Sequence, residues 1–290
     1  MTFDQLRIFV IVANHLNMRR AAELLNRTQP AVSAAIGALE SRGNVRLFHR
    51  VGRHLELTEV GKTFLPEAQA VLLRMEAARR TLSDLAGGQT GTLHIFASQT
   101  VATYWLPSRM ARFAATHPAV QLSLSVGNTT QALAAIVSGK AELGFIEGRV
   151  DETNILSQTI GEDRLGLYVA RDHPLAETKV DRKQLSTIGW ILREKGSGTR
   201  DHLVSGLRGL GLEFEDLDIR LELPSNGAVL NAVITGNFVC AVSDLAAESR
   251  LHAGMLSRLD CELPARTFKM IAHRERYKSR IAQAFIDAVN

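Results

Sequence analysis

Residues 17–40, NMRRAAELLNRTQPAVSAAIGALE, leave the chain little freedom to fold as anything other than a pair of helices. Their apolar residues recur at the period of a helix, and this period breaks once, at Asn26-Arg27. Thr28 occupies the position that helix N-caps favour, and Pro30 follows in the first turn, where its missing N–H costs nothing. The stretch therefore predicts two short helices joined by a tight turn.

The start of the second predicted helix is polar, and the residues around it are small. Gln29 and Ser33 project outward near its N-terminus, the end from which a helix-turn-helix reads base edges. Alanines on both helices allow a close crossing and entry into a major groove about 12 Å wide. A helical hairpin within an ordinary protein core is the alternative interpretation. The residues expected to contact DNA, including two in the wing described next, are Arg19, Arg20, Thr28, Gln29, Pro30, Ser33, Arg50 and Arg53.

Three further patterns surround this pair of helices. Residues 3–14 have a helical period and predict a helix that packs behind the pair. Residues 45–57 predict a short two-stranded wing with a cationic tip that can follow the phosphate backbone or enter the minor groove. A solvated basic loop is the alternative. Thr58 is placed to cap a helix over residues 59–86, about 40 Å long at 1.5 Å per residue. The apolar stripe of this helix predicts pairing with a second copy of the chain.

These residues together resemble the LysR-type transcriptional regulators, and the resemblance runs through the whole chain. It rests on Thr28-Gln29-Pro30-Ala31-Val32-Ser33, on FDQLRIF near the N-terminus, and on LFHR and LTEVG after the pair of helices. It implies promoter DNA and RNA polymerase as partners, a homodimer that pairs into a homotetramer, and a small-molecule effector. Two departures stand out. Met18-Arg19-Arg20 replaces the usual Ser or Thr, which predicts a missing helix cap, and Gly43-Asn44 replaces a bulky residue followed by Gly.

The composition restricts the class of protein. An apolar content of 46% in 290 residues supports more than one folded domain and excludes a largely disordered chain. Residues 1–60 hold eight Arg and five Asp or Glu, so they carry +3 of the formal net charge of +4, on the part expected to meet phosphates. No apolar run is long enough for a membrane span and no signal-peptide pattern opens the chain. We therefore expect a cytoplasmic protein without membrane contact.

The side chains that carry chemistry give no sign of catalysis. Cys240 and Cys261 lie far apart without metal-ligand spacing and are expected to be ordinary buried or half-buried thiols, with a redox-sensing pair as the alternative. The nine histidines show no metal spacing, no Ser or Cys has an evident His partner, and no carboxylate pair stands out. We therefore expect no enzyme activity, no metal and no cofactor.

Strands and helices alternate from residue 92 to the C-terminus, which predicts parallel α/β structure. Crossing strands near residues 156–161 and 263–266 are expected to join two lobes, and the resemblance implies the same two-lobed, periplasmic-binding-protein-like effector domain. The expected segments are a winged helix-turn-helix domain at 1–58, a dimerisation helix at 59–86, a flexible hinge at 87–91, and an effector domain at 92–290 with lobe I at about 92–161 and 267–290 and lobe II at about 162–266.

Polar residues follow several predicted strands and open the next helix, which is where ligands bind open α/β lobes. The run from Gly196 to Thr199 is expected to form a nest for an oxyanion, with Arg200 beside it. Ser225-Asn226 starts another helix that should converge on the same cleft. Glu147 is expected either to gate the cleft or to lie on the surface, and plain helix capping is the alternative for Asn128-Thr129 and for Ser225-Asn226. The residues expected to bind an effector are Ser98, Gln99, Thr100, Asn128, Thr129, Glu147, Gly196, Ser197, Gly198, Thr199 and Arg200.

Within the LysR-type family, residues 97–148 and 193–200 resemble the branch that includes regulators of sulfur assimilation (CysL-like) and of carbon dioxide fixation (CbbR-like). This resemblance implies a small anionic effector such as sulfite, sulfate, or a phosphorylated or carboxylated metabolite. The leading hypothesis is a regulator whose effector changes the placement of the DNA-binding domains. The alternative is a solute-binding receptor without a DNA-binding role. The operator, the effector, and the choice between activation and repression stay open.

Overall fold

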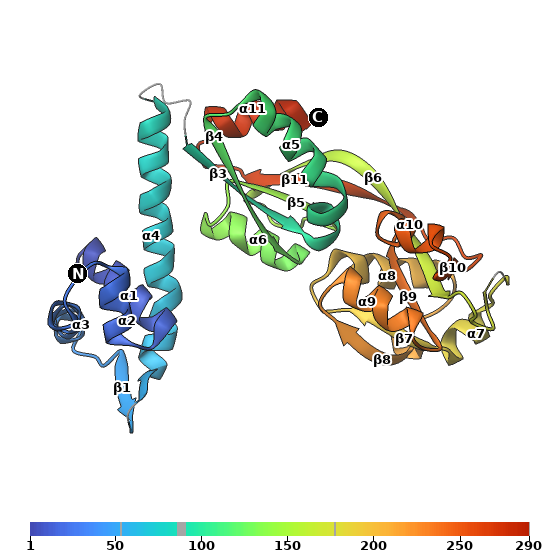
Figure 1. Ribbon diagram of the computed structural model, residues 1–290, viewed down its shortest axis with the longest axis horizontal. Coiled ribbons are helices and arrows are strands. Elements are labelled where there is room, and N and C mark those ends of the chain that lie inside the picture. The colour runs from blue at the N-terminus through green and yellow to red at the C-terminus, as the bar shows by residue number, and fades with distance from the viewer. Residues whose placement is uncertain (53, 86–90, 177, 290) are drawn as a thin grey trace. The chain divides into compact units, whose positions relative to one another are not determined.

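The computed structural model describes residues 1–52, 54–85, 91–176 and 178–289. The chain divides into two compact units, Met1–Ala86 and Gly87–Asn290 (Figure 1). Arg53 and residues 87–90 of the predicted hinge lie outside the described residues. The finer domain boundaries given above stay a prediction.

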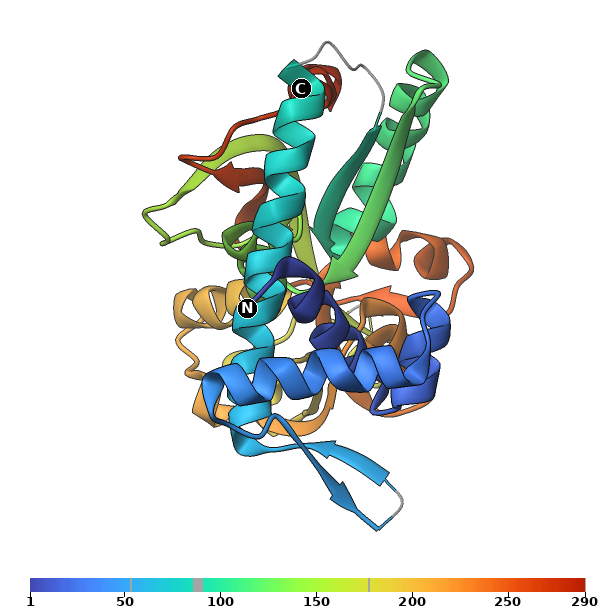
Figure 2. The same cartoon turned by 90° about the vertical axis from the view of Figure 1, so that its left-hand side faces the viewer.

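The first unit is a three-helix bundle with a two-stranded wing and one long helix (Figure 2). A single apolar core joins the bundle, the wing and the first half of the long helix, and the rings of Phe9 and Phe64 lie 5.2 Å apart within it. The winged helix-turn-helix and the long helix are therefore confirmed. Their elements are α1 (Phe3–His15), α2 (Met18–Leu24), α3 (Gln29–Gly43), β1 (Phe48–Val51), β2 (His54–Leu57) and α4 (Glu59–Leu85).

Side-chain caps set where these helices begin. The Thr28 hydroxyl accepts a hydrogen bond from the backbone N–H of Ala31 (3.4 Å), and the Thr58 hydroxyl accepts one from Gly61 (3.0 Å). The expectation that α2 lacks a cap is wrong, because the carboxamide of Asn17 accepts from the N–H of Arg20 (3.0 Å). The cap is therefore supplied by Asn17, the residue immediately before Met18-Arg19-Arg20.

The second unit consists of two α/β lobes (Figure 1). Lobe I contains β3 (Gly91–Ser98), the π-helix η1 (Val101–Trp105), α5 (Leu106–Thr116), β4 (Val120–Gly127), α6 (Thr129–Ser138), β5 (Leu143–Glu147) and α11 (Arg280–Val289). Lobe II contains α7 (Arg182–Thr187), β7 (Gly189–Arg193), α8 (Gly198–Gly209), the 3₁₀-helix η2 (Phe214–Asp216), β8 (Asp218–Leu223), α9 (Asn226–Ile234), β9 (Phe238–Ser243), α10 (Asp244–His252) and β10 (Leu256–Arg258). The strands β6 (Ile155–Ala170) and β11 (Ala265–His273) run between the lobes.

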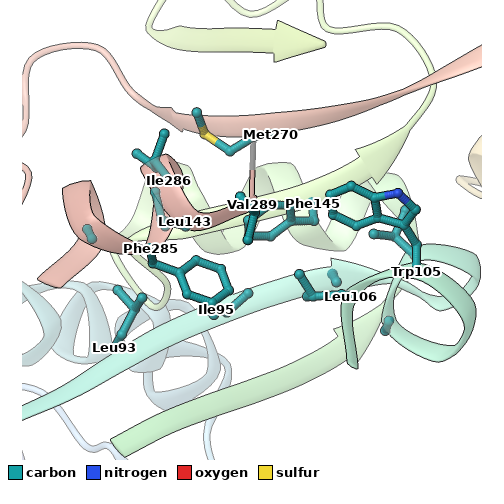
Figure 3. Close-up of a cluster of buried hydrophobic side chains, with 14 of the residues drawn as sticks. Leu93, Ile95, Trp105, Leu106, Leu143, Phe145, Met270, Phe285, Ile286 and Val289 are labelled. Carbon is teal, nitrogen blue, oxygen red and sulfur yellow. The ribbon is translucent and has the colours of Figure 1, made fainter. Parts of the chain in front are cut away.

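Helices cover both faces of the sheet in each lobe. In lobe I, α5 and α11 bury Phe113 and Phe285 beside Phe145 of β5: the ring centroids of Phe113 and Phe285 are 5.1 Å apart, and those of Phe285 and Phe145 are 6.0 Å apart. Figure 3 shows Phe145 and Phe285 within this apolar cluster. The helix α6 packs Ala132 and Ile136 on the other face. In lobe II, α7 and α8 lie on one face and α9 and α10 on the other.

The sheet runs without a break in pairing from one lobe to the other, in the order β4-β3-β5-β11-β6-β9-β7-β8, with β10 paired to β6. The strands β3, β4 and β5 are parallel, and so are β7, β8 and β9. Because β11 pairs with β5 and with β6, while β6 continues to pair with β9 and β10, these two strands carry the chain across the boundary. The predicted α/β fold with two lobes is confirmed.

Two details of this connection differ from expectation. A crossing strand was expected near residues 156–161, but β6 is one strand of 16 residues that continues to Ala170. In the polar run Glu162-Asp163-Arg164, the carboxylate of Asp163 is buried against Arg266 of β11, and the strand continues through it. Likewise the crossing strand expected near residues 263–266 begins at Ala265 and continues to His273 as β11.

Several elements of the second unit were not predicted. The π-helix η1 precedes α5, and the short helices α7 and α10 follow residues whose side chains cap them. The carboxylate of Asp181 accepts from the N–H of Gln184 (2.8 Å), and the hydroxyl of Ser243 accepts from the N–H of Leu245 (3.2 Å). These helices are too short for a clear apolar period, so their caps were the available signal.

Candidate functional site

The N-terminal end of α3 presents a polar face to solvent. Thr28, Gln29, Pro30 and Ser33 are all exposed, while Val32 beside them is fully buried in the bundle core. The helix therefore has one side that anchors it and another side that is free to meet a partner. This is the geometry that major-groove recognition requires.

The predicted cationic residues of the first unit are exposed where the structure describes them. Arg19 and Arg20 both lie near the carboxylate of Glu23 on α2, at 3.7 and 3.1 Å, in solvent-exposed pairs of small energetic value. Arg50 is exposed in β1. A phosphate can replace Glu23 as the partner of either arginine at little cost.

Glu40 is a buried acid that was not singled out from the sequence. Its carboxylate oxygen Oε1 accepts hydrogen bonds from the backbone N–H groups of Leu47 (2.7 Å) and Phe48 (3.1 Å). Glu40 lies near the end of α3, and Phe48 begins the wing, so the two bonds fix the wing relative to the recognition helix. A buried carboxylate that accepts two charge-assisted bonds holds such a junction strongly.

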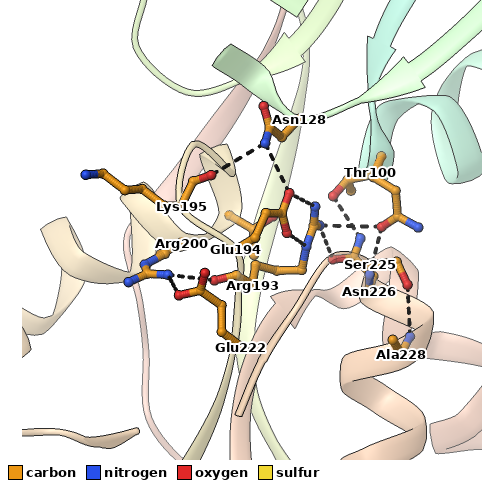
Figure 4. Close-up of polar contacts among 12 residues, drawn as sticks. Thr100, Asn128, Arg193, Glu194, Lys195, Arg200, Glu222, Ser225, Asn226 and Ala228 are labelled. Carbon is orange, nitrogen blue, oxygen red and sulfur yellow. Dashed lines mark hydrogen bonds and ion pairs between the residues drawn. The ribbon is translucent and has the colours of Figure 1, made fainter. Parts of the chain in front are cut away.

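In the second unit, the polar residues that open four helices or turns converge at the boundary between the lobes (Figure 4). Thr100 accepts from the Asn226 amide (3.0 Å), and the amide nitrogen of Asn128 lies 3.3 Å from a carboxylate oxygen of Glu194. We call the set the inter-lobe site. Its residues are Ser98, Gln99, Thr100, Asn128, Thr129, Glu147, Asp163, Arg193, Glu194, Ser197, Thr199, Asn226 and Arg266.

Glu147 lies at the centre of this site, and the alternative of a surface position is wrong because only 1% of the residue is exposed. The Ser98 hydroxyl donates to one carboxylate oxygen, and the Thr199 hydroxyl lies 3.4 Å from the other. The Thr129 hydroxyl donates to the Glu147 carbonyl (2.7 Å). Residues from both lobes therefore meet at one internal carboxylate.

Arg266 and Asp163 form a buried ion pair next to Glu147. The guanidinium of Arg266 donates to the Asp163 carboxylate (2.7 Å) and to the Thr199 hydroxyl (3.0 Å), and it lies 3.9 Å from Glu147. Ser243 donates to the other oxygen of Asp163 (2.8 Å). Removing one partner of such a pair would leave a buried, unpaired charge at a cost of about 3–5 kcal/mol, so neither residue can be changed alone without destabilising the fold.

The glycines of the predicted nest have a packing role. A Cβ on Gly198 would lie 2.0 Å from the carbonyl oxygen of Glu147, so only glycine allows α8 to approach lobe I this closely. Gly196 has φ of 88°, which favours glycine, and its carbonyl accepts from the N–H of Thr130 (3.3 Å). Ser197 is buried, and its hydroxyl has no hydrogen-bond partner in the part of the chain that the structure describes.

Arg200 points away from this nest. Its guanidinium donates to the carbonyl of Arg193 (3.1 Å) and pairs with the carboxylate of Glu222, whose pKa the hydrogen bond from Arg200 holds below its ordinary value. It also lies 5.1 Å from the ring centre of Phe214. The guanidinium of Arg200, which was expected to lie beside the nest, therefore forms these contacts with residues of lobe II.

Arg193 and Asn226 complete the site; the convergence of Asn226 on the cleft was expected, although it was not named as an effector residue, whereas Arg193 was not predicted at all. Arg193 is the last residue of β7, and its guanidinium donates to Asn226 (2.8 Å) and lies 3.4 Å from the Gln99 oxygen. The backbone N–H of Asn226 donates to the same Gln99 oxygen (2.8 Å). The rule that identified Ser98, which places ligands at the carboxyl ends of strands, would also have identified Arg193.

The remaining chemistry-bearing residues lie outside the site. Burial raises the pKa of the Cys240 and Cys261 thiols, and the two belong to different apolar clusters of lobe II. Among the described residues no three His, Cys, Asp or Glu side chains are grouped to hold a metal ion. No described helix combines the length and apolar character that crossing a membrane requires.

The two units match two family models. Residues 3–62 match the bacterial regulatory helix-turn-helix proteins of the lysR family, and residues 86–290 match the LysR substrate binding domain. The chain therefore belongs to the LysR family of transcriptional regulators, as its resemblance indicated.

Curated relatives are similar over nearly the full length. The uncharacterized HTH-type transcriptional regulator YeiE of Escherichia coli K12 is 34% identical over 288 residues, which span 99% of this chain and 96% of YeiE. Probable RuBisCO transcriptional regulators are 31% identical in Phaeodactylum tricornutum, over 98% of this chain and 94% of the relative, and 32% identical in Synechocystis, over 99% and 85%. The CbbR-like resemblance is thereby confirmed.

Solved structures share the fold. CbnR in complex with its target DNA has a TM-score of 0.76 at 22% identity and covers 100% of this chain and 99% of CbnR. The regulatory domain of CcmR from Synechocystis PCC6803, in complex with 2-PG, has a TM-score of 0.63 at 25% identity and covers 69% of this chain and 96% of that domain.

Proposed function

We propose that this regulator binds promoter DNA through α3 and the wing, and that a small anionic effector at the inter-lobe site controls its effect on transcription. The observation that carries the proposal is the convergence of helix starts from both lobes on a buried polar site, where the Ser197 hydroxyl has no hydrogen-bond partner among the described residues. Helix N-termini and hydroxyls favour anions. A coupling of about 1–3 kcal/mol between effector and DNA would make a useful switch.

The genes we propose it controls serve carbon assimilation. This rests on the names of the probable RuBisCO regulators and on 2-PG as the ligand of CcmR, and sulfur assimilation is the other possibility that the sequence left open. We further infer a cytoplasmic homotetramer that acts with RNA polymerase and has no enzyme activity. The family of DNA-binding regulators to which the chain belongs supports this inference.

DNA binding is tested by selecting genomic fragments with the full-length protein and measuring affinity for the best fragment over a range of salt concentrations. We expect Gln29→Ala to reduce the preference for that fragment over random DNA by about 1–3 kcal/mol, with little change in salt dependence. Arg50→Ala should instead lower the slope of log K against log salt by about one. Ser205→Ala, an exposed change on α8, is the control. A chain that selects no fragment is a solute receptor.

Effector binding is tested by thermal unfolding of the full chain with sulfite, sulfate, inorganic phosphate, small carboxylates and 2-PG. A ligand that binds only the folded state stabilises it by about 2.7 kcal/mol at one hundred times its Kd. We expect a saturable rise in Tm for at least one anion, and its loss in Thr100→Ala and Ser197→Ala but not in Ser205→Ala. The absence of any rise would contradict an anionic effector and leave the DNA test unaffected.

A further inference from the structure

The carboxylate of Glu194 occupies the inter-lobe site in the manner of a bound ligand (Figure 4). Nε of Arg193 donates to one of its oxygens (2.8 Å), and Nη2 of Arg193 donates to the other (2.9 Å). From the opposite lobe, the amide nitrogen of Asn128 reaches the same carboxylate at 3.3 Å. One carboxylate thus joins the two lobes through polar contacts.

The guanidinium that holds Glu194 is prepared to bind an anion. The side chain of Arg193 is 2% exposed, and its third nitrogen is fixed by Asn226 (2.8 Å), with the Gln99 oxygen at 3.4 Å. A buried guanidinium whose orientation is set on one edge offers its other edge to a carboxylate or phosphate in a bidentate geometry. That edge is where Glu194 lies.

Glu194 is freer to leave than Glu147. Glu147 is 1% exposed and lies in β5, where it pairs with Phe268 of β11. The Glu194 side chain is 23% exposed and lies beyond the end of β7, two residues before Gly196. A rotation of the Glu194 side chain therefore places its carboxylate in solvent without disturbing a strand.

The charge of the site favours an anion that displaces Glu194 over an anion that binds in addition to it. Among its described residues, the carboxylates of Glu147, Asp163 and Glu194 face the guanidinium groups of Arg193 and Arg266. A further anion would therefore enter a site with excess negative charge, and desolvated like charges repel strongly. An anion that replaces Glu194 adds one negative charge less to the site than the same anion bound beside Glu194.

We propose that Glu194 is a tethered competitor for the effector, and that a carboxylate or phosphate group of the effector displaces it from Arg193 and Asn128. This inference rests on the proposed effector site. It adds Arg193 as the residue that anchors the anion and Glu194 as the group that sets the effective affinity. The effector must bind Arg193 better than an intramolecular carboxylate does, so Glu194 raises the concentration at which the regulator responds.

The test is calorimetric titration of the full-length protein with 2-PG, inorganic phosphate, sulfate and sulfite, with glycerol as an uncharged probe. We expect Glu194→Gln to bind the same anion at least about tenfold more tightly than the unaltered chain, because the competing charge is gone. We also expect a lower Tm for ligand-free Glu194→Gln and a larger rise in Tm on anion binding. Glu222→Gln removes a comparable carboxylate from Arg200 and should leave the anion affinity unchanged.

The outcomes separate this inference from the proposed function. An anion that binds the unaltered chain and Glu194→Gln equally overturns the displacement of Glu194 and leaves the effector site standing. No anion binding to either protein overturns both. Arg193→Lys should weaken binding by about tenfold or more, since it keeps the charge and loses the bidentate edge. If that variant does not fold, the comparison of Glu194→Gln with Glu222→Gln still decides.

Discussion

A methyl group on Gly198 would lie 2.0 Å from the Glu147 carbonyl oxygen and 2.7 Å from the Thr129 hydroxyl oxygen. Neither neighbour can move independently, because Glu147 lies in β5 and Thr129 begins α6. Glycine is therefore required for packing, whereas the sequence suggested an anion nest. The residues that sequence reasoning placed near the site do lie together, but their contacts with one another depend on long-range packing that no local pattern encodes.

At this scale we predict that Gly198→Ala separates the lobes. Overpacking of a tight contact costs about 1–3 kcal/mol, and a clash with backbone on both sides should reach the upper end of that range. The matched control is Gly209→Ala on the same helix, because a Cβ there has nothing within 4 Å and removes backbone freedom from the unfolded chain. Thermal unfolding should show a loss of Tm for the first variant and no loss for the second. Equal Tm values would contradict the proposed contact.

At the scale of helices and strands, single polar side chains hold neighbouring elements together, and the period of the apolar residues does not predict these contacts. Periodicity and caps predicted α1 and α4 within about one residue of their observed ends. They did not predict that β6 continues through its polar centre, because the partner of Asp163 is Arg266, about a hundred residues later in the chain. Nor did they predict the role of Glu40, whose place in an amphipathic helix is typical of a surface residue. Only the structure shows that its carboxylate accepts hydrogen bonds from the residues at the start of the wing.

We predict that Glu40→Ala weakens DNA binding by releasing the wing. The change leaves the N–H groups of Leu47 and Phe48 without their acceptor, at a cost of about 1–3 kcal/mol of stability. Because the wing then loses its fixed position, the salt dependence of DNA affinity should also become shallower. Glu40→Gln keeps an oxygen acceptor and should retain most of both properties. If both variants bind DNA with the affinity of the unaltered chain, Glu40 has no positioning role.

Taken as a whole, the chain has a first unit whose core covers only part of its longest helix. Phe64, Leu65 and Leu72 of α4 pack against the bundle, but Leu82 and Leu85 further along are 70% and 63% exposed. Apolar side chains at helical spacing on the far half of a 27-residue helix favour a partner helix.

Val71 of α4 is also an exposed apolar residue (40%). We predict that Val71→Glu combined with Leu82→Glu converts the proposed homotetramer to smaller species. Charges on that stripe oppose helix pairing, and loss of one DNA-binding unit removes about half of the phosphate contacts, so the salt slope should fall by about half. Sedimentation velocity at micromolar concentration measures the first effect, and DNA titration over a range of salt measures the second. Arg74→Glu, an exposed change on the same helix, is the control. An unchanged sedimentation coefficient would rule out this stripe as the interface.

Arg164 and Ala265 are cross-strand partners on neighbouring strands, and everything between them in sequence belongs to lobe II. The chain thus leaves and re-enters lobe I at a single rung of the sheet. Dividing the chain at Arg164 and at Ala265 would release lobe II as one segment whose two ends lie side by side. Recombination between related genes that exchanges lobe II therefore has to preserve the register of this pair of strands and the contacts between the lobes, such as the packing of Gly198 against Glu147.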